Sequence, residues 1–128
     1  MVAPVIPGLT DHEIEAILKA ARDAGARDAG YVLLRLPLEI KDLFREWLAE
    51  QFPDRASRVI SPLRSMHGGK DYVAAFGHRQ RGSGPYADQI AALFRLARQR
   101  VGMADERLKL TTDLFVRPIV KGEQLPLF

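Results

Sequence analysis

The sequence predicts an α/β fold: a fragment of a partial (β/α) barrel with two parallel βα units, followed by a helical C-terminal extension. Two short apolar runs, residues 2–6 and 31–36, each lead within a few residues into a stretch with helical apolar spacing. Strands joined through a helix pair in parallel by a right-handed crossover. Two strands alone leave open edges, so we expect the chain to be a piece of a larger barrel, beginning partway through that fold.

The first unit begins with a strand at residues 2–6, whose apolar residues do not alternate, as is usual when both faces are covered. Thr10 and Glu13 predict a capping box at the start of the next helix, and Leu9 and Ile14 a hydrophobic staple. Gly25 is expected to end that helix. The predicted buried stripe consists of Ile14, Ile17, Leu18 and Ala21.

The second unit has a strand at residues 31–36, ended by Pro37, and a helix from near Leu38 to the stop at Phe52 and Pro53. Its apolar positions are Ile40, Leu43, Phe44, Trp47 and Leu48. The sequence next predicts a short helix over 54–61 broken by Pro62, then a glycine-rich basic loop over 67–84.

A last helix is expected over residues 85–101, opened by Pro85, with an extended tail over 102–128. Its inward positions are Tyr86, Ile90, Leu93, Phe94 and Ala97. We therefore divide the chain into late barrel units (1–52), a basic helical extension (53–102) and an extended C-terminal tail (103–128).

Cysteine is absent from all 128 residues, which excludes disulfides, thiolate zinc and cysteine-ligated iron–sulfur clusters within this chain. The histidines at 12, 67 and 78 lack metal-ligand spacing, so no metal site is predicted. No apolar run approaches the length of a membrane span, and no secretory signal opens the chain. We expect a cytoplasmic protein with no membrane contact.

Charge is unevenly distributed along the chain. Residues 1–52 carry six Lys and Arg against nine Asp and Glu, whereas residues 53–102 carry nine against three. A local basic excess favours phosphate-bearing partners, although a solvated helix face produces the same excess without a partner.

In parallel barrels, the loops after the strands carry the chemistry. Gly8 lies in the first such loop, where it would let the backbone approach a ligand, and Arg35 lies near the end of the second strand. In the alternative interpretation, Gly8 only makes the turn and Arg35 pairs with Glu39.

Residues 3–11 (Ala-Pro-Val-Ile-Pro-Gly-Leu-Thr-Asp) and 30–37 (Gly-Tyr-Val-Leu-Leu-Arg-Leu-Pro) resemble the late strands of radical SAM proteins in the branch related to spore photoproduct lyase. The resemblance continues through Gly77, Arg79, Arg81, Gly82, Gly84, Pro85 and Tyr86 and covers most of the chain.

This resemblance implies a partial barrel in which three cysteines hold a [4Fe-4S] cluster, and in which S-adenosyl-L-methionine binds the remaining iron and is cleaved to a radical. Those cysteines belong to an early loop that this chain lacks, so the cofactors would belong to the parent protein. Val5, Ile6 and Pro7 would form part of the wall beside the adenosyl group.

The basic loop combines cations, aromatic rings and flexible backbone. Arg79 and Arg81 are candidates for holding phosphates, while Tyr72 or Phe76 stacks on a base, a combination that suits nucleic acid. In the alternative, the aromatic residues pack down and the arginines cap helix carbonyls.

The last five residues, 124–128, resemble the short peptides by which bacterial replication and repair proteins dock on the polymerase sliding clamp. Gln124, Leu125, Leu127 and Phe128 occupy the four specified positions of that pattern. Two apolar side chains would enter a pocket while the glutamine hydrogen-bonds at its rim. Alternatively, Leu127 and Phe128 pack on the chain's own barrel edge.

Together these features predict the C-terminal portion of a radical SAM iron–sulfur protein, inactive as an isolated chain. Its partner would be the missing N-terminal half, and the parent would cleave S-adenosyl-L-methionine reductively, with nucleic acid and DNA repair as the expected setting. The rival hypothesis is a non-enzymatic module that binds nucleic acid or the sliding clamp.

Overall fold

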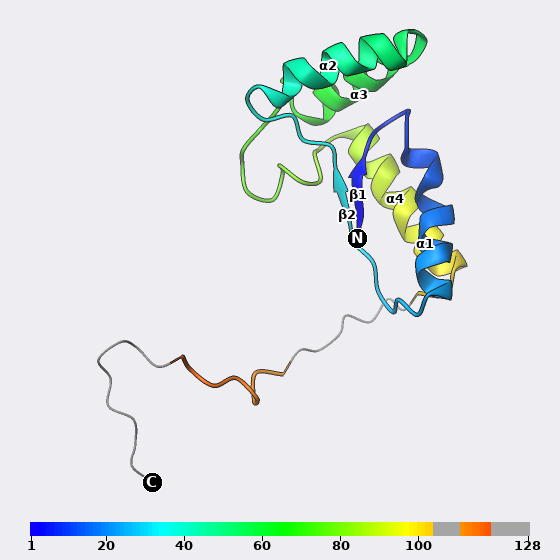
Figure 1. The fold of residues 1–128 in the computed structure, drawn as a ribbon, viewed down its shortest axis with the longest axis vertical. Helices are drawn as coiled ribbons and strands as arrows, with labels where there is room; N and C mark the ends of the chain where they lie inside the picture. The colour runs from blue at the N-terminus through cyan, green and yellow to red at the C-terminus, as the bar shows by residue number, and fades with distance from the viewer. Residues whose placement is uncertain (104–110, 119–128) are drawn as a thin grey trace.

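The computed structural model describes residues 1–103 and 111–118, and within them it is mixed α/β with two parallel strands and four α-helices (Figure 1). The strands are β1 (Val2–Val5) and β2 (Tyr31–Leu33). The helices are α1 (Ile14–Asp23), α2 (Ile40–Gln51), α3 (Ala56–Met66) and α4 (Pro85–Arg100). Short 3-10 turns at Asp11–Glu13 and Pro53–Arg55 precede α1 and α3.

The two strands pair in parallel, as predicted, with Val2 opposite Tyr31 and Val5 opposite Leu33. The register shifts between these two pairs, and the intervening Pro4 has no N–H to donate to a ladder. In the described part of the chain the sheet has only these two strands, so a partial barrel is not confirmed.

The two edges of this sheet differ. On the outer side of β2, the Leu33 N–H donates to the carbonyl oxygen of Gln80 at 2.9 Å, so the loop after α3 covers that edge. Among residues 1–103 and 111–118, no strand pairs with the outer edge of β1. Within the described residues, the outer edge of β1 therefore has no strand partner, whereas the outer edge of β2 is occupied at Leu33.

The start of α1 differs from the prediction. No side chain caps the 3-10 turn or the helix, and the Thr10 hydroxyl accepts a hydrogen bond from the Ile6 N–H at 2.9 Å. Leu9 and Ile14 lie in different apolar clusters, so the capping box and the staple are both wrong. The hydroxyl instead serves the turn that leaves the strand. Gly25 ends the helix at φ +95°, as predicted.

Helix α3 continues through Pro62, which the prediction treated as a break. Val59, Leu63 and Met66 are fully buried on one face, and their packing holds the helix although Pro62 donates no backbone hydrogen bond. The helix is therefore longer than the predicted segment 54–61.

The main core joins both strands to three of the helices, and it unites residues from segments 1–52 and 53–102. Figure 1 shows α1 and α4 together on one side of the strands, with α2 and α3 beyond the strands' carboxyl ends. The ring of Tyr31 of β2 packs at a tilt against that of Phe94 of α4, with ring centroids 4.8 Å apart. A smaller cluster of Leu9, Leu48 and Val59 fastens α2 and α3 to the loop after β1.

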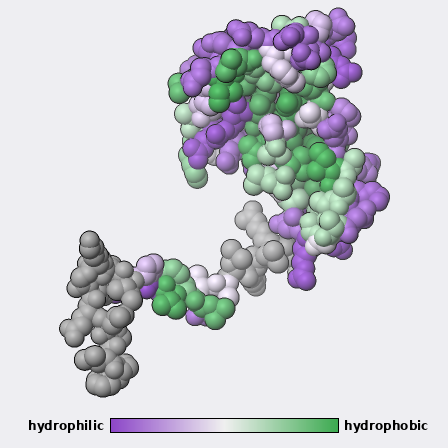
Figure 2. Space-filling model, viewed as in Figure 1, coloured by the Kyte–Doolittle hydropathy of each residue, from purple (hydrophilic) through white to green (hydrophobic). Residues whose placement is uncertain are grey.

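Several predicted inward residues are instead partly exposed, because each helix is covered on one narrow face. Those predicted inward are Ile17, Tyr86 and Leu93, and the α2 positions Ile40, Leu43 and Trp47, predicted only as apolar positions at helical spacing, are exposed as well. Figure 2 shows hydrophobic surface where Figure 1 places the start of α2. None of the helices in the described ranges combines the length and apolar composition that a membrane crossing requires.

Candidate functional site

In the loop that follows β1, the Asp11 carboxylate accepts two backbone hydrogen bonds. Asp11 Oδ2 accepts the Gly8 N–H at 2.9 Å, and Asp11 Oδ1 accepts the His12 N–H at 3.1 Å. Gly8 has φ +70°, a conformation that favours glycine. This geometry fixes the position of the Asp11 carboxylate at the carboxyl end of the strand.

Gly8 also lies against the backbone of α3. A Cβ atom added at Gly8 would be 3.2 Å from the Arg58 carbonyl oxygen. That carbonyl is four residues before Pro62, which has no N–H to donate to it. The absence of a side chain at Gly8 therefore lets the loop approach the turn of α3 that carries Arg58.

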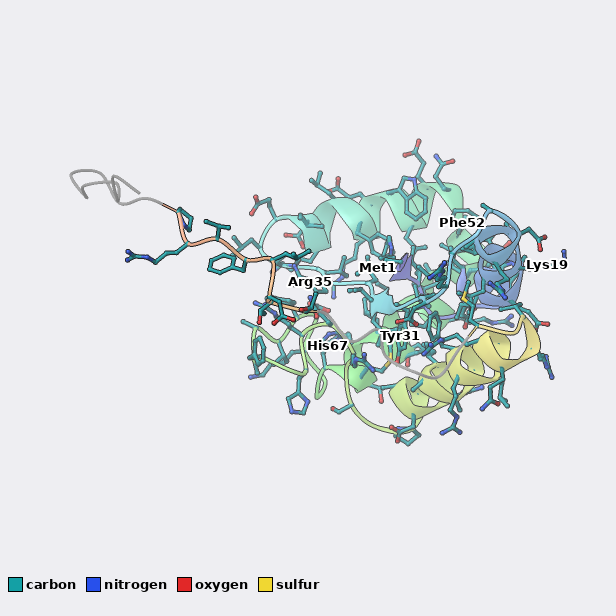
Figure 3. All side chains as sticks on the ribbon, turned by 90° about the horizontal axis from the view of Figure 1, so that it is seen from below. Met1, Lys19, Tyr31, Arg35, Phe52 and His67 are labelled. Carbon is teal, nitrogen blue, oxygen red and sulfur yellow. The ribbon has the colours of Figure 1, made fainter. Side chains whose placement is uncertain are left out.

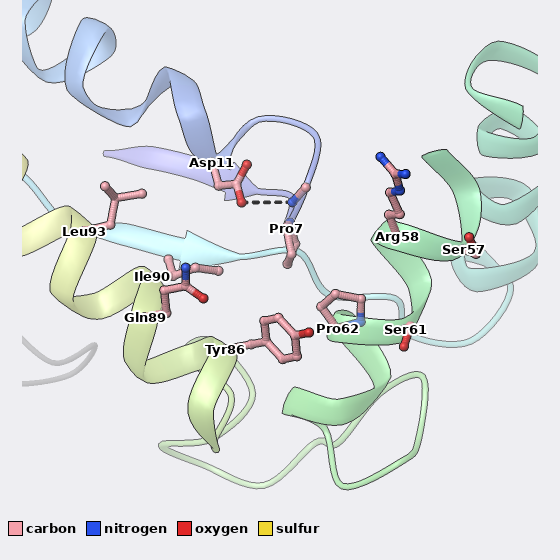
Figure 4. Close-up of a pocket in the computed structure, with 11 residues that line it drawn as sticks. Pro7, Asp11, Ser57, Arg58, Ser61, Pro62, Tyr86, Gln89, Ile90 and Leu93 are labelled. Atoms are coloured by element: carbon pink, nitrogen blue, oxygen red, sulfur yellow. Dashed lines mark hydrogen bonds between the residues drawn. The ribbon is translucent and has the colours of Figure 1, made fainter. Parts of the chain in front are cut away.

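A pocket of about 580 Å³ opens between this loop, α3 and α4. Figure 4 shows Tyr86 extending from the first turn of α4 toward Pro62 of α3, with Pro7 and Asp11 on the loop side. The lining residues are Pro7, Gly8, Asp11, Ser57, Arg58, Ser61, Pro62, Tyr86, Gln89, Ile90 and Leu93. The pocket adjoins the carboxyl end of β1, the end at which parallel α/β sheets bind ligands.

The polar groups of the pocket can act as donors and acceptors for a ligand. Within the described residues, the Arg58 guanidinium, the Gln89 amide and the Tyr86 hydroxyl form no hydrogen bond or ion pair with the protein. Proline rings and aliphatic side chains supply the remaining walls. This combination of apolar walls and a few polar groups is typical of sites for small organic molecules.

Of the predicted cofactor-wall residues, only Pro7 lines this pocket. The Val5 side chain is 1% exposed within the core, and Ile6 is half-buried between the two apolar clusters. Arg35, labelled in Figure 3, forms no ion pair with Glu39 in the described structure. Pro7 and Gly8 of the predicted loop both line the pocket.

The basic loop brings some of its predicted residues together. The Arg79 guanidinium lies over the Phe76 ring at 5.6 Å from its centroid, and the Phe76 side chain is 89% exposed. Arg81 lies over the ring of Tyr31 at the same distance, and Tyr72 is half-buried. The four residues therefore do not form one surface: the half-buried Arg79 pairs with the exposed ring of Phe76, whereas the exposed Arg81 lies over Tyr31.

Asp71 anchors this loop to two helices. Its Oδ1 lies 2.8 Å from Arg45 Nη2 on α2 and 3.6 Å from Arg64 Nε on α3. At the other end of the loop, the Ser83 N–H donates to the Met66 carbonyl oxygen at 3.0 Å. Both ends of the segment are thus fixed to the fold.

The surroundings of the buried Tyr31 of β2 shift the pKa of its phenol. Burial raises the pKa of the Tyr31 phenol, Arg81 opposes this, and Asp88 adds to it.

No group of three His, Asp, Glu or Cys in residues 1–103 and 111–118 could hold a metal ion.

The sequence interpretation missed Asp11, Arg58, Tyr86 and Gln89 as pocket residues. Asp11 follows the first strand directly, which was an available signal, whereas the helical residues carry no local pattern that distinguishes them. The predicted clamp-binding residues Gln124, Leu125, Leu127 and Phe128 lie outside the described residues.

Comparison with known proteins finds no matching family model, no similar curated protein and no similar solved structure.

Proposed function

We propose that this chain supplies the last two strand–helix units of a radical SAM protein, and that it works with an N-terminal half that carries the cluster cysteines. The parent protein would bind a [4Fe-4S] cluster and cleave S-adenosyl-L-methionine reductively, with nucleic acid as the substrate class. The proposal rests on the sequence resemblance at residues 3–11 and 30–37.

The observation that carries it best is the asymmetry of the sheet. The edge of β2 is occupied at Leu33 by the backbone of Gln80, while no described strand covers the edge of β1. Ala3 and Pro4 of β1 are exposed as well, although Val2 and Val5 are buried. Earlier barrel strands would pair at the β1 edge, which is the edge expected for the late part of a barrel.

This chain by itself does not fit the cluster, because it has no cysteine. The cluster, when bound by the N-terminal half, would supply the electron for cleavage. The contribution of this chain would be to close the barrel at β2 and to present the loop after β1, with Pro7 at its border.

The test begins with the DNA upstream of the Met1 codon, which should encode a segment with a three-cysteine loop. That segment and this chain are purified together without oxygen, reconstituted with iron and sulfide, and given a reductant and S-adenosyl-L-methionine. We expect 5′-deoxyadenosine by chromatography, and none when the cysteines are changed to alanine. An upstream region without such a loop, or a cluster-loaded complex that forms no 5′-deoxyadenosine, would contradict the proposal.

A second candidate function, binding of nucleic acid by this chain itself, is favoured by the exposed Phe76 ring with the Arg79 guanidinium over it. A base stacked on the ring beside a guanidinium is a common contact to single strands. Changing Arg79 and Arg81 to Ala should weaken binding of a single-stranded oligonucleotide and lower the log–log salt slope by up to about two units.

The matched control for that experiment changes Arg22 and Arg55 to Ala. Both are exposed, and the same amount of charge is removed elsewhere. If the control pair weakens binding as much as the loop pair does, net charge explains the affinity and the loop has no specific role. Thermal unfolding of each variant confirms that it is folded.

A further inference from the structure

We propose that the pocket between the β1–α1 loop, α3 and α4 binds a nucleoside monophosphate. The inference goes beyond the radical SAM proposal and does not rest on it, because every residue involved belongs to this chain. A nucleoside monophosphate combines a flat ring, hydroxyl groups and a phosphate, and the pocket offers a separate feature for each.

The ring fits the apolar part of the pocket. Pro7 and Pro62 form one side, and the Tyr86 ring with Ile90 and Leu93 forms the other. Tyr86 is 48% exposed and Leu93 is 37% exposed, so a ligand would cover apolar surface that the fold leaves open. Stacking of a base on a tyrosine face is favourable for every base. The volume of about 580 Å³ also lies within the roughly 300–1,000 Å³ of small-molecule sites.

The ribose hydroxyls fit Asp11. Each carboxylate oxygen accepts one backbone N–H, from Gly8 and from His12, which leaves further acceptor capacity on both oxygens. An acidic side chain that accepts hydrogen bonds from ribose hydroxyls is common in nucleotide sites. Gln89, across the pocket, adds an amide with both donors and an acceptor.

The phosphate fits Arg58. In the described structure this guanidinium has no ion pair, although other arginines of the chain pair with carboxylates at distances such as 2.8 Å for Arg45 and Asp71. Gly8 lies beside both Asp11 and the backbone of Arg58, and Figure 4 shows the Asp11 and Arg58 side chains on either side of the loop that begins at Pro7. A guanidinium matches the geometry of phosphate oxygens, and the hydroxyls of Ser57 and Ser61 lie on the same helix.

The test measures binding to the full chain by calorimetry, with AMP, GMP, CMP and UMP and with adenosine and inorganic phosphate alone. We expect at least one monophosphate to bind at millimolar concentration or better. The nucleoside should bind about tenfold more weakly, because it lacks the charge-assisted contact to Arg58. Amide NMR shifts should change at Gly8 and Gln89.

The decisive variant is Arg58→Gln, with Arg55→Gln as the matched control. Both arginines are exposed and lie close together in sequence, but only Arg58 lines the pocket. Arg58→Gln should weaken monophosphate binding about tenfold and leave adenosine binding unchanged. Asp11→Asn, which keeps an acceptor oxygen for the loop, should weaken both ligands.

Three results would overturn the inference. The first is no binding of any of the four monophosphates at 5 mM. The second is an equal effect of the Arg55 and Arg58 substitutions, and the third is a set of NMR shifts located outside the pocket. Failure of this test leaves the radical SAM proposal untouched, because cluster formation and 5′-deoxyadenosine are not part of it.

Discussion

Replacement of Gly82 by alanine should destabilise the fold strongly, because Gly82 lies where the basic loop closes on α3 and β2. Its φ is +65°, and an added Cβ would be 3.0 Å from Met66 Cβ and 3.4 Å from Leu33 Cδ1. Carbon atoms in contact normally stay about 3.5–4.0 Å apart, so the loop would have to move away from α3.

The magnitude follows from two contributions. The left-handed conformation costs an alanine about 1–2 kcal/mol, partly offset by the lower entropy of the unfolded chain. Overpacking against Met66 adds roughly 1–3 kcal/mol. The total of about 2–4 kcal/mol is a large part of the stability of a small domain, which is about 5–15 kcal/mol.

The matched control is Gly77→Ala in the same loop. Gly77 has φ +85°, but an added Cβ meets no atom within 4 Å, so only the conformational cost applies. Urea unfolding followed by circular dichroism gives both changes in unfolding free energy. Amide exchange at Leu33, whose N–H donates to Gln80, should also become faster in the Gly82 variant. Equal destabilisation by the two substitutions would refute the close packing of this loop.

Three further predictions concern the pH dependence, the cluster and the tail. Because burial raises the pKa of Tyr31 above its ordinary 10.0, the neutral phenol stabilises the fold fully below pH 10.0. Stability should then fall as pH rises through the folded-state pKa, and Tyr31→Phe should flatten this dependence in urea titrations; an identical slope in the variant would exclude Tyr31 as the cause. Anaerobic reconstitution of this chain alone should yield no stoichiometric iron and no visible cluster absorption, since it offers no thiolate; a bound cluster would refute that reasoning. Deletion of Leu127 and Phe128 should abolish micromolar binding to a bacterial sliding clamp, since apolar anchors commonly contribute about 2 kcal/mol or more; lower thermal stability together with no clamp binding by the intact chain would mean that these residues pack on the fold.

The strands could be predicted because their signal is local. Apolar runs at residues 2–6 and 31–36, each closed by a proline, were enough to place both strands and their parallel pairing. Their carboxyl ends were predicted too long, since Ile6 gives its N–H to Thr10 instead of a ladder. The apolar periodicity of the sequence does not indicate that a hydroxyl four residues away will accept this N–H.

The interior of α3 and the pocket could not be predicted in the same way. Pro62 is tolerated because Val59, Leu63 and Met66 are buried against other elements, and tertiary packing of this kind overrides a local breaker. The pocket combines residues as distant as Pro7 and Leu93, so no sequence window contains it. Gly8 was singled out because it directly follows a predicted strand, and Pro7 because of the family resemblance.

The most direct test of the central proposal is hydrogen exchange at the two strands, measured in this chain alone and in complex with the upstream cysteine-bearing segment. The account predicts that backbone amides of β1 exchange more slowly in the complex, because a further strand pairs at its edge, while those of β2 change little. Protection that increases at β2 and not at β1, or at neither strand, would contradict the assignment of this chain to the late part of a barrel.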